Sequence, residues 1–190
     1  MIRLFVAIDL PEDHRQSLAA LTGGVPGAKW LGPEQLHLTM RFIGEVDEVM
    51  CRDIADALSR VETPTFELTV AGMGYWGDRR RAKVLWAGIK ANPVLARLQG
   101  KIETALVRIG VEPARRKYHP HITLARLHLE SRHRVADFLG RNGGLALAPF
   151  RVEHFILYSS FLSASGAIHQ PEALFALRGA EISEQLLAGQ

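Results

Sequence analysis

Cysteine is nearly absent from this sequence, and long hydrophobic runs are missing. Among 190 residues only Cys51 is a cysteine, so the chain can form no disulfide within itself. The apolar residues 4–8 are followed at once by Asp9, which makes them too short a run for a membrane-spanning helix or a secretory signal. We therefore expect a cytoplasmic protein in a reducing compartment, with no membrane segment.

Neither sign of charge is in large excess. The chain carries 23 Lys and Arg residues against 20 Asp and Glu residues, and 47% of its residues are hydrophobic. These values exclude a highly charged disordered chain and suit a folded protein with one sizeable core. The basic residues nevertheless cluster, and such runs either steer a polyanion or form an ordinary solvated surface. The runs are Arg79-Arg80-Arg81 with Lys83, Arg115-Arg116-Lys117, and Arg132 with Arg134.

Two short segments of the chain repeat one another. His37-Leu38-Thr39-Met40 and His121-Ile122-Thr123-Leu124 both read His, apolar, Thr, apolar, and they lie 84 positions apart (121 − 37 = 84). Each belongs to a run that is typical of a β-strand, in which side chains alternate between two faces. Each copy therefore places a His and a Thr on one face and two hydrophobic residues in the core behind them.

Two histidines beside two threonines suit acid–base chemistry on a phosphodiester. Imidazole has a pKa of about 6.5, so one ring can accept a proton from water while the other donates one to the leaving oxygen. The threonine hydroxyls can hold the phosphate oxygens between the rings, and the arrangement requires no metal ion. The alternative is a non-catalytic nucleotide- or RNA-binding module. Two intact His-Thr pairs favour catalysis, because binding alone gains little from two titratable bases.

The repeat extends beyond the two motifs. In each half, 29 positions separate the motif histidine from a Phe that begins a strand, namely Phe66 and Phe150, each closely preceded by proline. This matching predicts two similar β/α lobes that share a central cleft. Glycines near residues 72–77 predict a turn between the halves. Besides the motif strands, we expect strands over residues 4–9, 66–70, 84–89 and 150–158, and helices over about 11–21, 47–61, 93–109 and 131–139.

Longer segments around the motifs carry a family resemblance. RLFVAIDLP at the start, QLHLTMRFIGEVDE around the first motif, VLWAGI in the middle and HPHITLAR around the second resemble the 2H phosphoesterase superfamily. Within it they are most similar to the RNA 2′,3′-cyclic phosphodiesterases, once described as 2′-5′ RNA ligases. The resemblance runs from Arg3 to about Leu177. It implies an α+β fold of two pseudo-symmetric lobes with largely antiparallel sheets, as one domain over residues 1–190 with lobes exchanging near 71–84 and a tail after about 178.

The resemblance also implies an activity and roles for the motif residues. The chain would open a 2′,3′-cyclic phosphate at an RNA end to leave a 2′-phosphate, or join it to another RNA, without a cofactor or metal, and we expect a monomer. His37 would donate the proton to the leaving oxygen and His121 would activate water. Thr39 and Thr123 would hold the phosphate. The residues alone do not decide which histidine is the acid, because the half-sites look alike.

The alternation of side chains along a strand gives different expectations for two arginines near the motifs. Arg126 matches a phosphate-contacting position of the family, but strict alternation places it on the face opposite His121, so the strand must end or bulge first. For Arg41 the expectation is reversed. Strand alternation places it on the same face as His37, where it either faces the cleft or lies at an ordinary position on the rim.

Each of the other histidines and aromatic residues could act in the site or could simply pack in the core or lie on the surface. His119 with His121 could bind a metal, but no nearby cluster of carboxylates or cysteines completes such a site. We therefore expect His119 either to support the residues of the site or to lie exposed on the surface. For His14, His128, His133, His154 and His169 we expect surface or core positions, with a cleft role open for His169. Aromatic side chains expected near the cleft either stack on bases or pack in the core, namely Phe42, Tyr75, Trp76, Trp86 and Tyr118. Ser159 and Ser160 either face the phosphate or form a turn.

Overall fold

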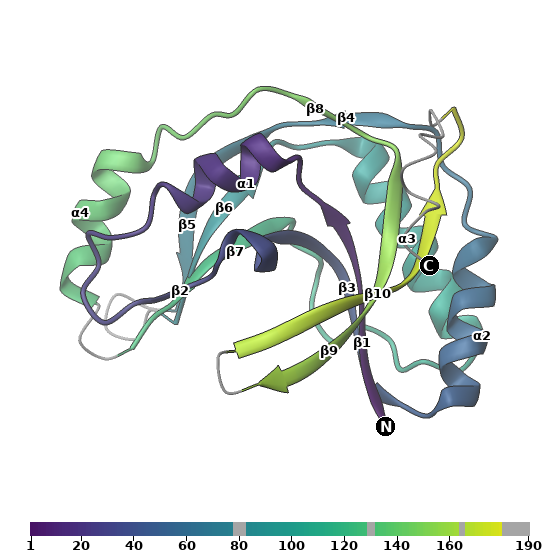
Figure 1. Cartoon of the computed structure of the whole chain (residues 1–190). Helices are drawn as coiled ribbons and strands as arrows, with labels where there is room; N and C mark the ends of the chain where they lie inside the picture. Colours follow the sequence, from purple (N-terminus) through teal and green to yellow (C-terminus); the bar gives the residue numbers. More distant parts are fainter. Residues whose placement is uncertain (78–82, 129–131, 164–165, 180–190) are drawn as a thin grey trace.

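The chain is built around one curved antiparallel sheet. The computed structural model describes residues 1–77, 83–128, 132–163 and 166–179. Eight strands form the sheet in the order β10-β9-β1-β3-β7-β6-β5, with β2 beside β7, and β4 pairs with β8 in a small second sheet (Figure 1). The expected α+β class with antiparallel sheets is confirmed. The strands are β1 (Ile2–Asp9), β2 (Lys29–Trp30), β3 (His37–Val46), β4 (Phe66–Leu68), β5 (Val70–Trp76), β6 (Val84–Ile89), β7 (His121–Arg126), β8 (Phe150–Val152), β9 (His154–Ser163) and β10 (Gly166–Ala176).

Local signals in the sequence set where the helices begin. Asp47 caps its helix by accepting a hydrogen bond of 2.8 Å from the Met50 amide. Asn92 caps the next by accepting from the Val94 amide at 2.8 Å, and Pro93 occupies its first turn. The helices are α1 (Glu12–Ala19), α2 (Glu48–Ser59), α3 (Pro93–Arg108) and α4 (Arg132–Asn142), and a short 3-10 helix, η1, spans Pro33–Gln35.

The two halves of the chain meet at a pseudo-twofold axis. In the large sheet β3 pairs with β7 through Leu38 and Ile122, which are 84 positions apart. In the small sheet Glu67 of β4 faces Arg151 of β8, again 84 positions apart. An antiparallel pair in which residue i faces its own equivalent marks a twofold axis. Both strand pairs therefore join residues that are 84 positions apart, which is the separation of the two motifs.

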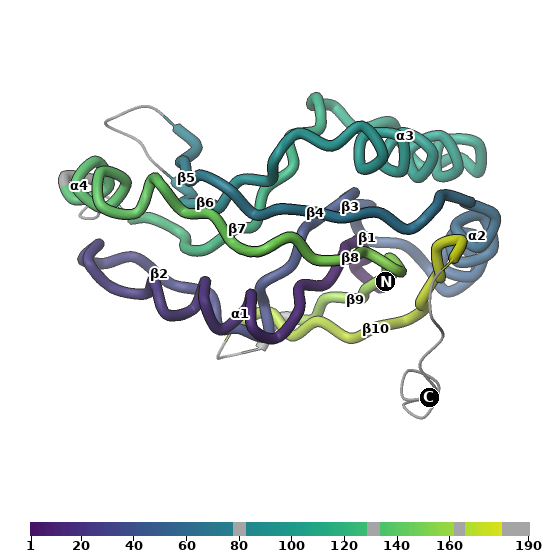
Figure 2. Tube along the Cα trace, turned by 90° about the horizontal axis from the view of Figure 1, so that it is seen from above, coloured from purple at the N-terminus to yellow at the C-terminus, as the bar shows by residue number. Residues whose placement is uncertain are grey.

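Each half of the sheet contains a strand from the other half of the sequence. The β5 strand leaves the first repeat to pair with β6, and β9 leaves the second to pair with β1. Figure 2 shows β4 and β8, the segments that lead into these exchanged strands, running side by side across the molecule. The exchange interlocks the lobes, because neither half of the sheet is complete without a strand from the other repeat.

The observed strands differ from the expected ones in specific places. The strand expected over 66–70 is two strands, which end and begin on either side of Thr69, and the one expected over 150–158 is likewise interrupted at Glu153. The turn expected at the midpoint glycines is wrong for Gly72 and Gly74, which lie inside β5. Two further strands, β2 and β10, had no expected counterpart.

The hydrophobic residues of both motifs form the centre of the core. Leu38, Met40, Ile122 and Leu124 are at most 2% exposed, and they pack in one cluster with buried residues of α2 and α3. A second cluster places Phe138 of α4 with buried residues of β6 and β7. The helices therefore cover the side of the sheet to which the motif hydrophobes point, which leaves the histidines and threonines on the other side.

A glycine gives room for a tryptophan beside the second motif. A Cβ atom added to Gly74 would lie 2.3 Å from the Trp86 ring. Trp86 is in register with Thr123 on the neighbouring strand. We predict that Gly74→Ala displaces this indole and lowers the free energy of unfolding by about 1–3 kcal/mol, as measured by urea denaturation.

The matched control is Gly100→Ala on α3, where nothing lies within 4 Å of the added methyl group. This variant should be more stable by about 0.5–1 kcal/mol, because alanine favours a helix interior. Equal stability of Gly74→Ala and the wild-type protein would contradict the packing argument.

Candidate active site

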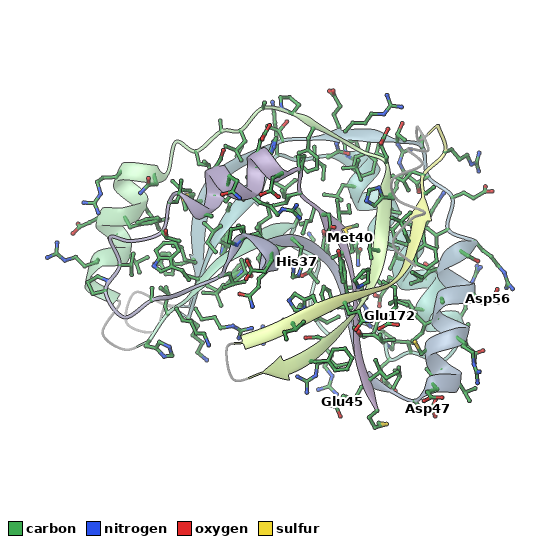
Figure 3. The ribbon with its side chains drawn as sticks, in the orientation of Figure 1. His37, Met40, Glu45, Asp47, Asp56 and Glu172 are labelled. Carbon is green, nitrogen blue, oxygen red and sulfur yellow. The ribbon has the colours of Figure 1, made fainter. Side chains whose placement is uncertain are left out.

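One cleft collects the candidate residues from both halves. A hollow of about 580 Å³ is lined by His37 and Thr39 of β3 and by His121, Thr123 and Arg126 of β7. Because Leu38 faces Ile122 in an antiparallel pair, each histidine lies across from the threonine of the other motif. The structure thus brings all five sequence-predicted site residues to one cavity. Figure 3 shows His37 near the middle of the molecule, away from Glu45 and Asp47 beyond it along the chain.

A β-bulge occurs at the same place in both motifs. Ala7 faces Thr39 while Val6 faces Arg41, so Met40 is the extra residue in β3. In β7, Leu124 is the extra residue in the same way, between the partners of Trp86 and Leu85. Each bulge turns two consecutive residues away from the cleft and resets the alternation of the strand.

The bulges decide which residues enter the cleft. The fifth residue after each histidine lines the cavity, which is Arg126 in the second half and Phe42 in the first. The bulge that the sequence required for Arg126 is present. The parity argument is wrong for Arg41, whose side chain points away from the cleft, forms an ion pair of 2.5 Å with Glu103 of α3 and is 11% exposed.

Both motif histidines are held through a backbone carbonyl. The Nδ1 atom of His121 is 2.8 Å from the carbonyl oxygen of His119, and the His37 ring hydrogen-bonds to the backbone of Gln35, also two residues before it. A carbonyl oxygen only accepts, so the Nδ1 of His121 carries the proton of that bond and its Nε2 remains to exchange protons with a ligand. The support role expected for His119 is exerted through its carbonyl group.

The two histidines have different surroundings. The pKa of His37 is lowered to about 4, chiefly by burial and also by the like charges of His169 and His121, against the opposing effect of the hydrogen bond to Gln35. The His169 ring lies 5.3 Å from the His37 ring and also lines the cleft. Burial lowers the pKa of His169 as well. His37 is therefore neutral at pH 7 while the cleft holds no anion.

Each motif histidine packs against an aromatic ring. The ring of Phe5 lies 5.0 Å from that of His37, and Phe5 also contacts Phe42 at 5.9 Å. On the other side Trp76 lies 5.8 Å from His121 and 4.9 Å from His119. These contacts restrict the rings to the cleft wall.

Sequence reasoning identified only part of the lining. Phe42, 66% exposed, lines the cleft, whereas Tyr75, Trp76, Trp86 and Tyr118 do not line it, and Ser160 lines it while Ser159 is buried. Phe5, Trp30, Lys29, Gln35 and Arg3 also line it and were not predicted. The parity of β1, which places Phe5 on the same face as Arg3, was the available signal for that residue. For Lys29 and Trp30 no periodic pattern existed, because β2 has two residues.

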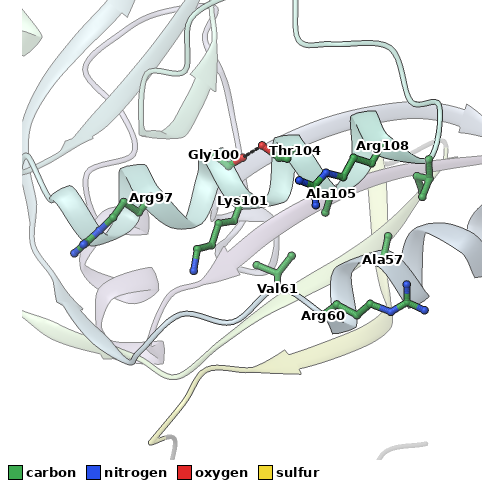
Figure 4. Close-up of a pocket in the computed structure, with 10 residues that line it drawn as sticks. Ala57, Arg60, Val61, Arg97, Gly100, Lys101, Thr104, Ala105 and Arg108 are labelled. Carbon is green, nitrogen blue, oxygen red and sulfur yellow. Dashed lines mark hydrogen bonds between the residues drawn. The ribbon is translucent and has the colours of Figure 1, made fainter.

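A second hollow lies outside this cleft. It measures about 650 Å³ and is formed by the end of α2 and one side of α3, with Arg60, Arg97, Lys101 and Arg108 on its rim (Figure 4). Its lining among the described residues contains no histidine or carboxylate, so these residues offer no acid–base pair. The basic runs, for which steering of a polyanion and an ordinary solvated surface were both open, do not line either hollow where the structure describes them. Arg79-Arg80-Arg81 and the side chain of Arg132 lie outside what the structure describes.

The described parts of the chain contain neither a cluster of metal-ligating side chains nor a helix suited to cross a membrane. Within residues 1–77, 83–128, 132–163 and 166–179, no three side chains of His, Cys, Asp or Glu come together as a metal site would need. No helix in these ranges is both long enough and apolar enough to cross a membrane.

A duplicated α+β fold with two His-Thr pairs on one cleft defines a two-histidine phosphoesterase architecture. The family model for LigT like phosphoesterases matches residues 8–86 and 89–169, and each segment contains one motif. The chain belongs to this family.

Individual relatives agree with this membership. An RNA 2′,3′-cyclic phosphodiesterase of Archaeoglobus fulgidus is 29% identical over 177 residues, covering 92% of this chain and 99% of that protein. One of Escherichia coli is 34% identical over 128 residues, covering 65% and 71%. The crystal structure of E. coli LigT complexed with 3′-AMP superposes with a TM-score of 0.75 at 28% identity, covering 93% of this chain and 98% of that one.

The lowered pKa of His37 predicts a pH dependence of stability. The folded-state pKa of about 4 lies below the value of about 6.5 for an unfolded chain, so the unfolded chain binds the proton first as the pH falls. Stability from the neutral ring is complete above pH ~6.5 and is lost towards pH ~4, by up to about 3 kcal/mol. The variant His37→Asn should lose less stability over this window in urea titrations at successive pH values.

Comparison with the wild-type protein isolates His37, because burial also lowers the pKa of His154 and His169 and those residues remain in both. Parallel curves for the two proteins would show that His37 titrates at its ordinary pKa.

Proposed function

We propose that this chain hydrolyses 2′,3′-cyclic phosphates at RNA ends to 2′-phosphates, with His37 and His121 as acid and base. The observation that carries the proposal is the crossing of β3 and β7, which presents two His-Thr pairs to one cavity. The cavity lining includes Arg3, Lys29 and Arg126 and, among the described residues, no carboxylate, so it suits an anionic ligand. The names of the family relatives support the same substrate.

The reaction follows from the groups that face the cavity. His121 takes a proton from water, and the resulting oxygen attacks phosphorus as the bond from phosphorus to the 3′-oxygen breaks. His37 gives a proton to that 3′-oxygen, so the phosphate remains on the 2′-oxygen. Thr39, Thr123 and Arg126 donate hydrogen bonds to the non-bridging oxygens, on which negative charge develops. Attack by the 5′-hydroxyl of another RNA in place of water would give 2′-5′ ligation.

The acid role of His37 requires that substrate changes its protonation. In the empty cleft the ring is neutral, since burial lowers its pKa to about 4. A bound phosphate places a negative charge beside the ring, which favours the imidazolium form and raises that pKa. We infer that His37 becomes the proton donor only when the phosphate is bound.

The proposal extends to organisation and location. A single domain over residues 1–190 with two lobes is supported by the continuous sheet and the exchanged strands. A monomer fits a site whose residues all come from one chain. A reducing cytoplasm is supported by the lone Cys51.

Replacing either motif histidine by alanine should lower kcat/KM by about two to four orders of magnitude, which is the usual contribution of a general acid or base. The assay is hydrolysis of a short RNA that ends in a 2′,3′-cyclic phosphate, in the presence of EDTA, with identification of the product as a 2′-phosphate. Thr39→Ala and Thr123→Ala should lose less.

The control is His128→Ala, an exposed histidine outside the cleft, which should retain wild-type turnover. A 3′-phosphate product would mean that the 2′-oxygen, and not the 3′-oxygen, leaves phosphorus. Binding of the RNA without turnover by the wild-type protein would favour the non-catalytic module, and loss of turnover in EDTA would refute the metal-independent scheme.

A sulfur-substituted substrate separates the acid from the base. When sulfur replaces the 3′-oxygen of the cyclic phosphate, the leaving group needs no proton, because a thiol has a pKa of only about 8.5. We predict that His37→Ala then recovers to within about tenfold of wild type, while His121→Ala remains defective. The reverse pattern would exchange the two roles.

A further inference from the structure

The three cationic side chains that line the cleft differ in whether a described carboxylate pairs with them. Arg3 forms an ion pair of 2.7 Å with Glu45, its partner across β1 and β3. Lys29 and Arg126 also line the cleft, but no carboxylate of the described residues lies within ion-pair distance of either one. Two positive charges at this end of the cavity therefore lack a negative partner in the described parts of the protein.

The strand register places these two cations together. Lys29 of β2 is the direct partner of Arg126 of β7, and directly opposite residues of an antiparallel pair project from the same face about 5 Å apart. Like charges in this arrangement are destabilising. Both side chains are exposed and border the cavity, so an anion bound between them would relieve the repulsion.

Only one flank of the cleft has this arrangement. The residue equivalent to Arg126 in the first half is Phe42, and no strand of the described residues lies beside β3 in the way that β2 lies beside β7. The pseudo-symmetry of the histidines and threonines is therefore broken at the end of β7. A substrate that binds both flanks has one orientation in the cleft.

The two cations lie at different distances from the reacting phosphate, Arg126 on the motif strand β7 and Lys29 on the strand beyond it. Because Leu124 is an extra, bulged residue, Arg126 lies only two register positions beyond Thr123 against β6, which is about 7 Å of strand at ~3.3 Å per residue. A long arginine side chain can reach back from there towards the threonine. Lys29 is on the next strand, about 4.8 Å further out than Arg126, so it is placed to meet a neighbouring phosphate rather than the reacting one.

We propose that Lys29, beside Arg126, binds the phosphate that links the terminal nucleotide to its 5′ neighbour. This inference rests on the proposed function, because it places the cyclic phosphate between His37 and His121. In an RNA that ends in a cyclic phosphate, the next phosphate along the chain is on the 5′-oxygen of the same ribose. An ammonium group with three donors is suited to a phosphate of this kind. The site would thus distinguish an RNA end from a cyclic mononucleotide.

Two substrates that differ by this one phosphodiester test the proposal. Adenosine 2′,3′-cyclic phosphate lacks it, and the dinucleotide ApA with a 2′,3′-cyclic phosphate end has it. For Lys29→Ala, KM of the dinucleotide should rise about three- to tenfold more than KM of the mononucleotide. The slope of log KM against log salt for the dinucleotide should also fall by about 0.7, because one fewer phosphate is neutralised.

Two variants make the test specific. Lys29→Arg keeps the charge and should retain the dinucleotide preference. Lys90→Ala removes an exposed lysine that lines neither hollow and should behave as wild type with both substrates. An equal change in KM for the two substrates in Lys29→Ala, or an unaltered salt slope, would overturn the proposal.

A binding measurement separates this proposal from the proposed reaction. Calorimetric titration with the two 2′-phosphate products, adenosine 2′-phosphate and ApA with a 2′-phosphate end, requires no turnover. If the wild-type protein hydrolyses neither substrate but Lys29→Ala selectively weakens binding of the dinucleotide, the reaction is refuted and the phosphate site stands. If the wild-type protein hydrolyses both substrates and Lys29→Ala has no selective effect, the phosphate site is refuted and the reaction stands.

Discussion

The pairing of Leu38 with Ile122 is the contact on which the rest of the site depends. It sets the register of the two motif strands, so it fixes at once which side chains enter the core and which face the cleft. A slip of one residue would bring four buried hydrophobic residues to the cleft face. At about 1.5–3 kcal/mol each, that loss rivals the whole stability of a typical domain, about 5–15 kcal/mol. Core packing therefore maintains the positions of the histidines.

A symmetric scaffold supplies equal groups, and its departures from symmetry give them different chemistry. Both bulges follow a motif threonine, yet one directs Phe42 and the other Arg126 into the cleft. His37 lies beside Phe5 and His169, whereas His121 lies beside Trp76. Pairs of titratable groups in unlike surroundings are how one site holds both an acid and a base. The duplication alone would have left the two imidazoles interchangeable.

Local signals in the sequence predicted much of this structure. Asp47 and Asn92 begin helices by capping them, and the two motifs identify the central strands. Geometry that depends on a neighbouring strand could not be predicted in this way. The extra residues Met40 and Leu124 appear as bulges only against β1 and β6, so simple alternation misplaced Arg41. The short β2 carries no periodicity, and its Lys29 gains meaning only from its register with Arg126.

The composition of the cleft couples ligand binding to proton transfer. In the parts of the chain that the structure describes, its lining contains basic residues and histidines but no carboxylate, so no acidic group of this lining stabilises a second proton on the rings. Burial and the neighbouring His169 and His121 both disfavour the charged form of His37. An anionic phosphate reverses the balance, because it adds the missing negative charge within a desolvated site where electrostatic interactions are strong. A carboxylate at that position would raise the pKa of His37, so that the ring would carry a proton from solvent even without substrate, and it would compete with the phosphate for the cations. With no acidic residue in the described lining, the substrate itself is the group that brings the proton donor to its charged form.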